Sequence, residues 1–306
     1  MNILVTGGAG FIGSHLLELL TTNKQDHITV VDNLSSGSIN NIPPGVKFLQ
    51  LDIREAALRE VFANGKFEAV VHLAAQTMVP FSIEHPDIDA DINVQGLLNV
   101  LEACRQYKVK NFLFASSAAV YGDNEQVPLL EESDTQPTSF YGISKMVAEH
   151  YLRVYHKLCG LNATVFRFAN VYGERQGNGG EGGVVSIFGK LLAAGKGLNV
   201  YGDGEQTRDF VYAGDVARAL AAGLHSNGYQ IINVATNVEV SVNELLATFE
   251  QVVGRKLPVS YEPIRTGDIY RSCLDNHKLK RLLGVTPVTT LPVGISKTYQ
   301  YFINAH

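Results

Sequence analysis

The chain has 306 residues, of which 45% are hydrophobic and 18% are charged, the balance of an ordinary globular protein with room for one or two domains. Its formal net charge is -5, from 30 acidic and 25 basic side chains. This composition excludes the basic surface typical of proteins that bind nucleic acids or anionic membranes.

The N-terminal sequence MNILVTGGAG contains no basic segment of the kind that begins a signal peptide. No apolar run approaches the ~18 residues of a membrane-spanning helix. Cys104, Cys159 and Cys273 lie far apart and have no C-x-x-C spacing, which indicates buried, reduced thiols rather than a disulfide framework or a metal site. We therefore expect a cytoplasmic protein.

Short apolar runs alternate with helical patterns through the first half of the chain. Several runs are continuous in Val, Ile, Leu and Phe, as in strands that are buried on both faces of a parallel sheet. The predicted strands are residues 2–7, 27–32, 46–50, 68–74, 110–116 and 162–169. The predicted helices between them are residues 11–22, 54–63, 89–107 and 138–158. This alternation predicts an α/β fold with a doubly wound, Rossmann-like parallel sheet.

The pattern changes after about residue 170. A glycine-rich stretch at 173–183 predicts a flexible loop. The elements predicted after it are a helix at 184–195, strands at 198–202 and 229–235, and helices near 241–253, 275–283 and 290–303. We interpret the chain as two parts that exchange segments. The larger domain comprises residues 1–169 plus about 207–235, and a smaller mixed α/β lobe comprises about 170–206 plus 236–306.

A glycine motif follows the first predicted strand. In VTGGAGFIG, Gly7, Gly10 and Gly13 are three residues apart and open a helix. Glycines in this context let backbone N–H groups approach a pyrophosphate at the N-terminus of the helix. Asp32 ends the next strand, where a carboxylate hydrogen-bonds ribose hydroxyls and repels a 2′-phosphate. The motif therefore predicts a dinucleotide site that prefers NAD to NADP.

Further motifs extend this pattern nearly from end to end, among them TGGAGFIGSHL, VVDNLSSG, VVHLAAQ, FASSAAVYGD, YGISK and QTRDFVYAGDVA. In their order and spacing they resemble the extended short-chain dehydrogenase/reductase family, in particular its NAD-dependent epimerase/dehydratase branch and the UDP-hexose 4-epimerases within it. The resemblance implies that NAD contacts Gly7, Gly10, Phe11, Ile12, Gly13, Asp32, Asn33, Asp52, Ile53, Leu73, Ala74, Ala75, Tyr141 and Lys145. Asp52 and Ile53 would border the adenine, and Lys145 would reach the nicotinamide ribose.

Tyr141 and Lys145 stand four residues apart in a predicted helix and therefore share one face. A useful tyrosine base needs a pKa ~3 units below its usual value of ~10, which corresponds to ~4 kcal/mol. One cation ~4 Å away supplies about that much at an effective dielectric constant of ~20. We expect the Lys145 ammonium, together with the oxidised nicotinamide, to lower the pKa of Tyr141. By resemblance, Ser117 is the third catalytic residue.

The residues after Ser117 separate the reaction types of this branch. Relatives that dehydrate or decarboxylate nucleotide sugars usually have an acidic residue there, whereas this chain has Ala118 and Ala119. This favours epimerisation through a transient 4-keto sugar, with Tyr141 taking the proton of the 4-hydroxyl group. A UDP-glucuronate 4-epimerase, a dehydratase and a non-catalytic NAD-binding regulator are the alternatives.

The second half of the chain supplies candidate residues for a UDP-sugar substrate. Guanidinium groups bind phosphate oxygens in a bidentate manner. By resemblance, the substrate-binding residues are Ser117, Asn170, Tyr201, Arg208, Arg265, Asp268 and Ser272. Ser272 aligns where some relatives have a bulky aromatic residue, so a small side chain there leaves room for an N-acetyl group. His72 is expected to be structural, and the helices at 89–107 and 138–158 are expected to pair in a homodimer.

Overall fold

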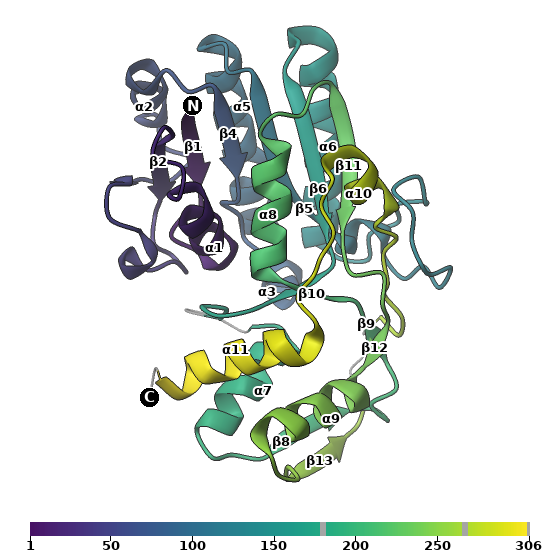
Figure 1. The fold of residues 1–306 in the computed structure, drawn as a ribbon. Helices are drawn as coiled ribbons and strands as arrows, with labels where there is room; N and C mark the ends of the chain where they lie inside the picture. Colours follow the sequence, from purple (N-terminus) through teal and green to yellow (C-terminus); the bar gives the residue numbers. More distant parts are fainter. Residues whose placement is uncertain (178–181, 265–268, 305–306) are drawn as a thin grey trace.

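The computed structural model describes residues 1–177, 182–264 and 269–304, and a seven-stranded parallel sheet forms its larger part (Figure 1). The strand order is β11-β6-β5-β4-β1-β2-β3. The direction of chain progress therefore reverses between β1 and β4, where α/β folds bind their ligands. The strands are β1 (Asn2–Thr6), β2 (His27–Asp32), β3 (Lys47–Gln50), β4 (Ala69–His72), β5 (Asn111–Ser117), β6 (Asn162–Phe168) and β11 (Tyr229–Val234). The predicted doubly wound sheet is confirmed.

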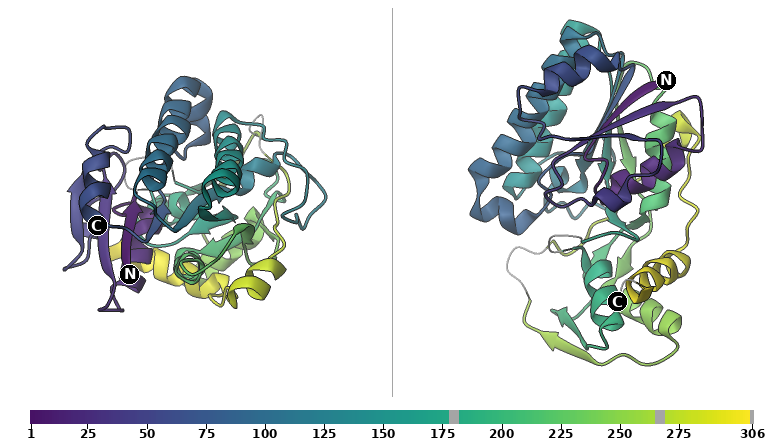
Figure 2. Two further views of the ribbon diagram at one scale, coloured as in Figure 1. Left: turned by 90° about the horizontal axis from the view of Figure 1, so that it is seen from above. Right: turned by 90° about the vertical axis from the view of Figure 1, so that its left-hand side faces the viewer.

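Helices cover both faces of this sheet, as the view from above shows (Figure 2). Leu16 and Leu17 of α1 (Phe11–Leu20) and Leu220 of α8 (Ala213–Gly223) pack in the apolar core on one face. The core on the opposite face takes residues from three helices: α2 (Leu58–Gly65), α5 (Gly96–Gln106) and α6 (Phe140–Cys159). Burial of apolar residues on both faces explains why the strands are almost continuously hydrophobic.

The segment predicted as one helix over residues 89–107 is divided, so this prediction was wrong in detail. It follows α3 (Val79–Glu84) and consists of α4 (Pro86–Ala90), a π-helical turn (η2, Asp91–Gln95) and α5. The N–H of Gly96 donates to the carbonyl of Asp91, five residues earlier. Apolar periodicity continues through such a turn and does not reveal it, and π-turns are frequent at functional sites.

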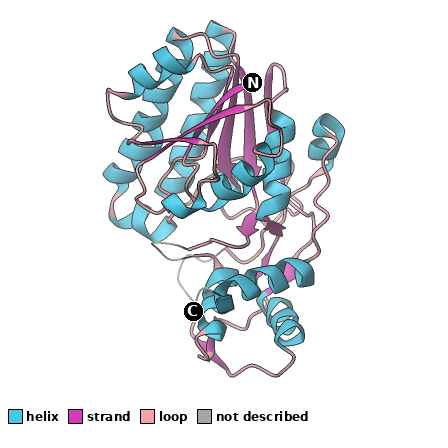
Figure 3. Cartoon of the chain, turned by 60° about the vertical axis from the view of Figure 1, so that its left-hand side comes forward, coloured by secondary structure: helices cyan, strands magenta, loops and turns pink. Residues whose placement is uncertain are grey.

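The second lobe lies beneath the sheet, separated from it in both views by thin connecting segments (Figures 1 and 3). Its core is formed by Phe188, Leu192, Leu245, Phe249 and Ile295. It contains α7 (Val184–Ala193), β8 (Leu198–Tyr201), α9 (Val242–Val253), β13 (Val259–Glu262) and α11 (Leu291–Asn304). The ladders at the junction are β7 (Asn170–Tyr172) with β10 (Phe210–Tyr212), and β9 (Thr207–Arg208) with β12 (Val240–Ser241). The remaining helices are η1 (Ile39–Asn41), η3 (Ala118–Tyr121) and α10 (His277–Leu283).

The start of the glycine-rich stretch is anchored to the sheet domain. The Arg175 guanidinium donates to both carboxylate oxygens of Glu18 on α1, at 2.6 and 3.0 Å. The Tyr212 hydroxyl donates to the Glu174 carboxylate at 2.8 Å. Residues 173–177 and 182–183 lie in turn or irregular structure, as the predicted loop requires, and these contacts attach the first of them to the sheet domain; residues 178–181 lie outside the described part.

The cysteines differ from expectation at one position. Cys104 and Cys273 are buried free thiols, whereas Cys159 is an exposed free thiol. Cys159 is the last residue of α6, directly before the C-cap Gly160. None of the helices within the described ranges is both long and apolar enough to cross a membrane.

Candidate active site

The glycine turn packs directly against the loop after β4. Gly7 has φ 72°, and a Cβ added there would lie 2.5 Å from the backbone nitrogen of Ala74. A Cβ added at Gly13 would lie 2.5 Å from the carbonyl oxygen of Gly7. Backbone atoms cannot yield to such contacts, so both positions require glycine. The close packing places Leu73, Ala74 and Ala75 beside the turn, as expected for a shared cofactor site.

The N-terminus of α1 is suited to bind an anion. Gly10 is the N-cap, and no side chain caps this end of the helix. The first N–H groups of a helix have no partner within it, and their dipoles favour negative charge. The N–H groups of Phe11, Ile12 and Gly13 are in this position. They are the groups that the pyrophosphate of a dinucleotide would use.

Asp32 ends β2 next to this turn, and its carboxylate is held in a fixed orientation. One oxygen accepts the Ala9 N–H at 3.0 Å, and the other accepts the Leu34 N–H at 2.8 Å. Burial raises the pKa of Asp32, and these two backbone bonds oppose that shift. A carboxylate oxygen can accept more than one hydrogen bond. Asp32 therefore retains capacity for ribose hydroxyls.

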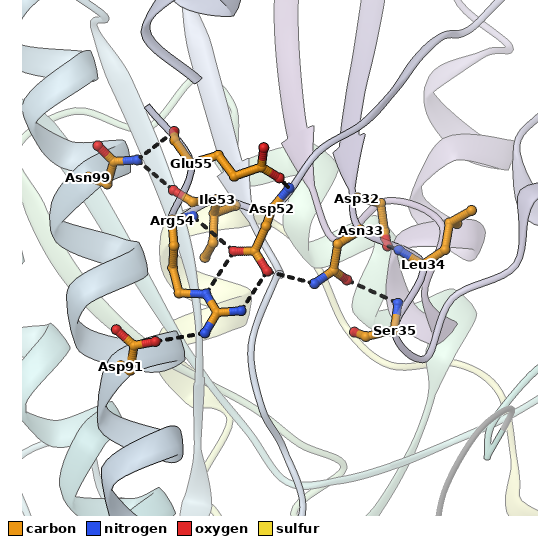
Figure 4. A network of polar contacts seen from close by, with 10 residues as sticks. All are labelled: Asp32, Asn33, Leu34, Ser35, Asp52, Ile53, Arg54, Glu55, Asp91 and Asn99. Carbon is orange, nitrogen blue, oxygen red and sulfur yellow. Dashed lines mark hydrogen bonds and ion pairs between the residues drawn. The ribbon is translucent and has the colours of Figure 1, made fainter. Parts of the chain in front are cut away.

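A polar network surrounds the predicted adenine position (Figure 4). The Arg54 guanidinium donates to both oxygens of Asp52, at 2.9 and 2.7 Å, and also to Asp91 at 2.7 Å. Arg54 holds the pKa of the Asp52 carboxyl well below its usual range. Asn33 donates to the same carboxylate at 2.8 Å. The network fixes Asp52 between β2, the turn before α2 and the π-helical turn.

The Asp52–Glu55 turn displaces the start of the following helix. Asp52 accepts the N–H of Arg54 at 2.9 Å, and Glu55 accepts the N–H of Asp52 at 2.9 Å. Asn99 of α5 donates to the carbonyl of Ile53 at 2.6 Å. The predicted helix at 54–63 therefore begins only at Leu58, because these local bonds compete with helix formation.

The start of α6 brings Tyr141 to Ser117. The Ser139 hydroxyl caps α6 by accepting the Gly142 N–H at 3.1 Å. Gly142 packs closely on η3, since a Cβ there would lie 2.6 Å from the carbonyl oxygen of Ala119. The Ser117 side chain lies close enough to Tyr141 to lower the pKa of its hydroxyl, against the effect of burial. A serine at the end of β5 and a tyrosine in α6 thus meet at the carboxyl edge of the sheet.

Lys145 lies beneath this pair and is buried. Its ammonium donates to the carbonyl of Ala115 at 2.9 Å and lies 5.7 Å from the centre of the Tyr141 ring. Burial lowers the pKa of Lys145 to about 8, although Asp89 acts in the opposite direction. The helical spacing of Tyr141 and Lys145 is thus confirmed, and both reach the same site.

Burial opposes the phenolate form of Tyr141. It raises the pKa of Tyr141 to about 12, Ser117 acts in the opposite direction, and Asp89 raises the pKa further. The reason is desolvation, which disfavours the charged form of a buried tyrosine. Lys145 alone therefore does not produce a phenolate near neutral pH, and the joint effect of Lys145 and oxidised nicotinamide stays a prediction.

His72 is structural, as expected. Its Nδ1 atom is hydrogen-bonded to the Thr6 hydroxyl at 2.8 Å. Its ring stacks on the ring of Phe114, with the ring centres 6.0 Å apart. Burial and the nearby Lys145 charge lower the pKa of His72 to about 3. His72 is therefore neutral at physiological pH and adds no charge next to the site.

Ser116 has a different role from its neighbour Ser117. Its hydroxyl donates to the buried Glu149 carboxylate at 2.6 Å. Arg167 donates to both oxygens of Glu149, at 3.0 and 2.7 Å. The ion pair and the Ser116 hydrogen bond together join α6 to β6 and β5, next to the predicted catalytic residues.

Three predicted substrate residues meet around Asp209. The N–H of Asn170 donates to the backbone carbonyl of Asp209 at 2.9 Å, and Arg208 precedes Asp209 in the chain. Ser272 lies next to Cys273, whose thiol approaches the Asp209 carboxylate at 3.8 Å. Asp209 itself is fully buried and accepts the N–H groups of Thr236 and Asn237.

Tyr201 ends β8 in the second lobe and is half-buried. Its carbonyl accepts the Gln206 amide at 2.7 Å, which connects it to the segment before Arg208. The predictions for Arg265 and Asp268 lie outside the described residues. No group of His, Cys, Asp or Glu in the described ranges is arranged to hold a metal ion.

Sequence reasoning missed a buried polar group next to the predicted catalytic residues. Asp89 on α4 and Asn93 in η2 are 1% and 4% exposed. The Asn93 amide donates to the Ser144 hydroxyl at 3.1 Å and to the backbone carbonyl of Gln76 at 3.0 Å. The sequence feature that could have indicated them is the spacing of two polar residues four apart in a segment with apolar periodicity.

Comparison with known proteins identifies the family. The NAD dependent epimerase/dehydratase family model matches residues 3–235. The chain belongs to this family. It is 43% identical, over 99% of its length and 98% of the relative's, to a putative UDP-glucose 4-epimerase of Methanocaldococcus jannaschii.

Solved structures of this epimerase/dehydratase family have the same fold. One is UDP-glucose 4-epimerase of Thermotoga maritima with UDP-glucose, with a TM-score of 0.96, 41% identity and coverage of 100% and 99% of the two chains. Another is UDP-glucose 4-epimerase of Thermus thermophilus with NAD, with a TM-score of 0.94, 40% identity and full coverage of both chains. NAD is thus the cofactor, in agreement with the glycine turn, the uncapped α1 and Asp32.

Proposed function

We propose that the protein is an isomerase that interconverts the C4 epimers of a UDP-hexose through a transient 4-keto sugar. The observation that supports this best is the meeting of Ser117, Tyr141 and Lys145 at the carboxyl end of β5, on the same edge of the sheet as the glycine turn. Bound NAD would supply the oxidant at C4 and return the electrons, so the net reaction is redox-neutral.

Each residue has a defined task in this proposal. The Tyr141 oxygen takes the proton of the sugar 4-hydroxyl and later returns it. Ser117, which lies beside Tyr141, holds the same sugar oxygen in line with the phenol. Lys145 places a positive charge beside the ring, which favours the phenolate.

The nucleotide part of the substrate is held by residues at the junction of the two lobes. We propose that Arg208 and Arg265 bind the diphosphate, with Asn170 and Asp268 nearby, and that Tyr201 packs against the base. In this proposal, residues 1–169 plus about 207–235 bind NAD, and about 170–206 plus 236–306 bind the nucleotide sugar. Ala118 and Ala119, which follow Ser117 at the start of η3, provide no acid for eliminating water.

Product analysis tests this function. The purified protein is incubated with UDP-glucose, UDP-N-acetylglucosamine or UDP-glucuronate, without added NAD, and the products are identified by NMR. We expect an isomer of equal mass from UDP-glucose and no product with the Tyr141→Phe variant. Loss of water, or turnover that the Phe variant retains, would contradict the proposal.

Ser272 sets the size of the sugar that fits. It is half-buried between Arg271 and Cys273 at the lobe junction. Because a serine leaves space near C2 of the hexose, we propose that both plain and N-acetylated UDP-hexoses are substrates. Ser272→Tyr should lose activity on the N-acetylated substrates selectively, and equal retention of both activities would refute this assignment.

We also propose that the protein is a cytoplasmic homodimer. On α6, Ile143, Val154 and Leu158 are 41%, 47% and 75% exposed and follow one another at helical spacing. Such a stripe suits packing of helix against helix. Val154→Glu should shift the molar mass from light scattering to that of a monomer, whereas Leu282→Glu on α10 should not.

A further inference from the structure

We propose that Asp89 is the fixed negative counter-charge of the Tyr141–Lys145 pair and a positioning residue that sets the protonation of both. This inference rests on the proposed roles of Tyr141 and Lys145. Asp89 lies on α4, is 1% exposed and has no part in the mechanism described above.

The neighbours of Asp89 hold it as an acceptor of hydrogen bonds. The Gln76 side chain donates to Asp89 Oδ1 at 2.8 Å, and the Asn93 side chain donates to the same oxygen at 3.2 Å. The orientation of each side-chain amide is fixed by a second hydrogen bond that its oxygen accepts. The oxygen of Asn93 accepts the Gln76 N–H at 2.8 Å, and the oxygen of Gln76 accepts the Met78 N–H. Two NH₂ groups therefore face Asp89, which is what an ionised carboxylate requires.

The same contacts connect Asp89 to both parts of the site. Gln76 follows Leu73, Ala74 and Ala75, the loop that packs on the glycine turn. Asn93 reaches Ser144, the residue before Lys145, at 3.1 Å. Among the described residues, this carboxylate binds side-chain amides and forms no ion pair, so its charge is left to act on the ionisable groups nearby.

Those groups are Tyr141 and Lys145 on α6, because His72 on β4 is held neutral by burial. The negative charge of Asp89 raises the pKa of Tyr141 and of Lys145. It thus keeps Lys145 protonated despite burial, at the cost of a more basic Tyr141. Removing the charge should make both groups more acidic.

The test compares Asp89→Asn, which keeps the shape and loses the charge, with Asp89→Glu, which keeps the charge. Tyrosinate absorbance is titrated in the NAD-loaded enzyme, with Tyr141→Phe as the blank, alongside the pH profile of kcat/KM. We expect Asp89→Asn to move the Tyr141 midpoint and the acid limb of the profile to lower pH, by on the order of one unit. Asp89→Glu should restore the wild-type midpoint.

Asp87→Asn is the matched control, because Asp87 is an exposed acidic residue on the same helix. It should leave midpoint and profile unchanged. Equal Tyr141 midpoints in Asp89→Asn and wild type would overturn the proposal, whether or not epimerisation is found, because the absorbance reports Tyr141 directly.

Asp89→Ser provides a second neutral variant if Asp89→Asn does not fold. Failure of both neutral variants to fold, with Asp89→Glu folded, would also overturn the proposal. The charge would then serve the fold and not the site.

Discussion

The titration of Tyr141 should depend on the redox state of the bound cofactor. Burial raises the pKa of this tyrosine to about 12. Acting as a base near pH 7 requires a decrease of ~5 units, or ~7 kcal/mol. Lys145, 5.7 Å from the ring centre, is already part of the environment that gives this value. One further positive charge ~4 Å away would supply ~4 kcal/mol of the decrease, or ~3 units, at an effective dielectric constant of ~20.

The oxidised nicotinamide ring has that charge, and the reduced ring is neutral. We expect the Tyr141 midpoint to lie ~3 units lower with NAD than with NADH. The assay is tyrosinate absorbance against pH for each loaded form, with the Tyr141→Phe variant subtracted. Equal midpoints in the two forms would refute this account, as would a midpoint near neutrality in the protein without cofactor.

Two further predictions concern stability and cofactor retention. Glu149→Gln should reduce the free energy of unfolding in urea by about 3 kcal/mol, because it leaves the Arg167 charge buried without its partner. Lys256→Gln, which breaks the exposed ion pair with Glu250, should reduce it by less than ~1 kcal/mol. Similar losses in both variants would contradict the buried pairing. Gly13→Ala should release NAD on gel filtration, because its Cβ would lie 2.5 Å from a backbone atom. Gly254→Ala, at the end of α9, should retain NAD and reduce the free energy of unfolding by about 1 kcal/mol. Retention of NAD by the first variant would show that the turn can relax.

Local patterns predicted the fold well. The seven strands of the sheet begin and end within two residues of the predicted ranges, because buried parallel strands are marked by continuous apolar runs. The helix of Tyr141, predicted at 138–158 from its apolar spacing, is observed at Phe140–Cys159. The interruption at Asp91–Gln95 was not predicted, since a π-turn leaves the apolar pattern almost unchanged.

The sequence by itself determined the α/β class, the glycine turn with Asp32, and the positions of Ser117, Tyr141 and Lys145. The glycine turn and the Tyr141–Lys145 pair depend on short-range spacing, which the chain displays directly, whereas Ser117 was assigned by family resemblance. The tertiary structure decided the direction of the Tyr141 pKa shift and the presence of Asp89 beside it. Both depend on burial and on charges from segments far apart in the chain, which meet only when α4, β5 and α6 pack together.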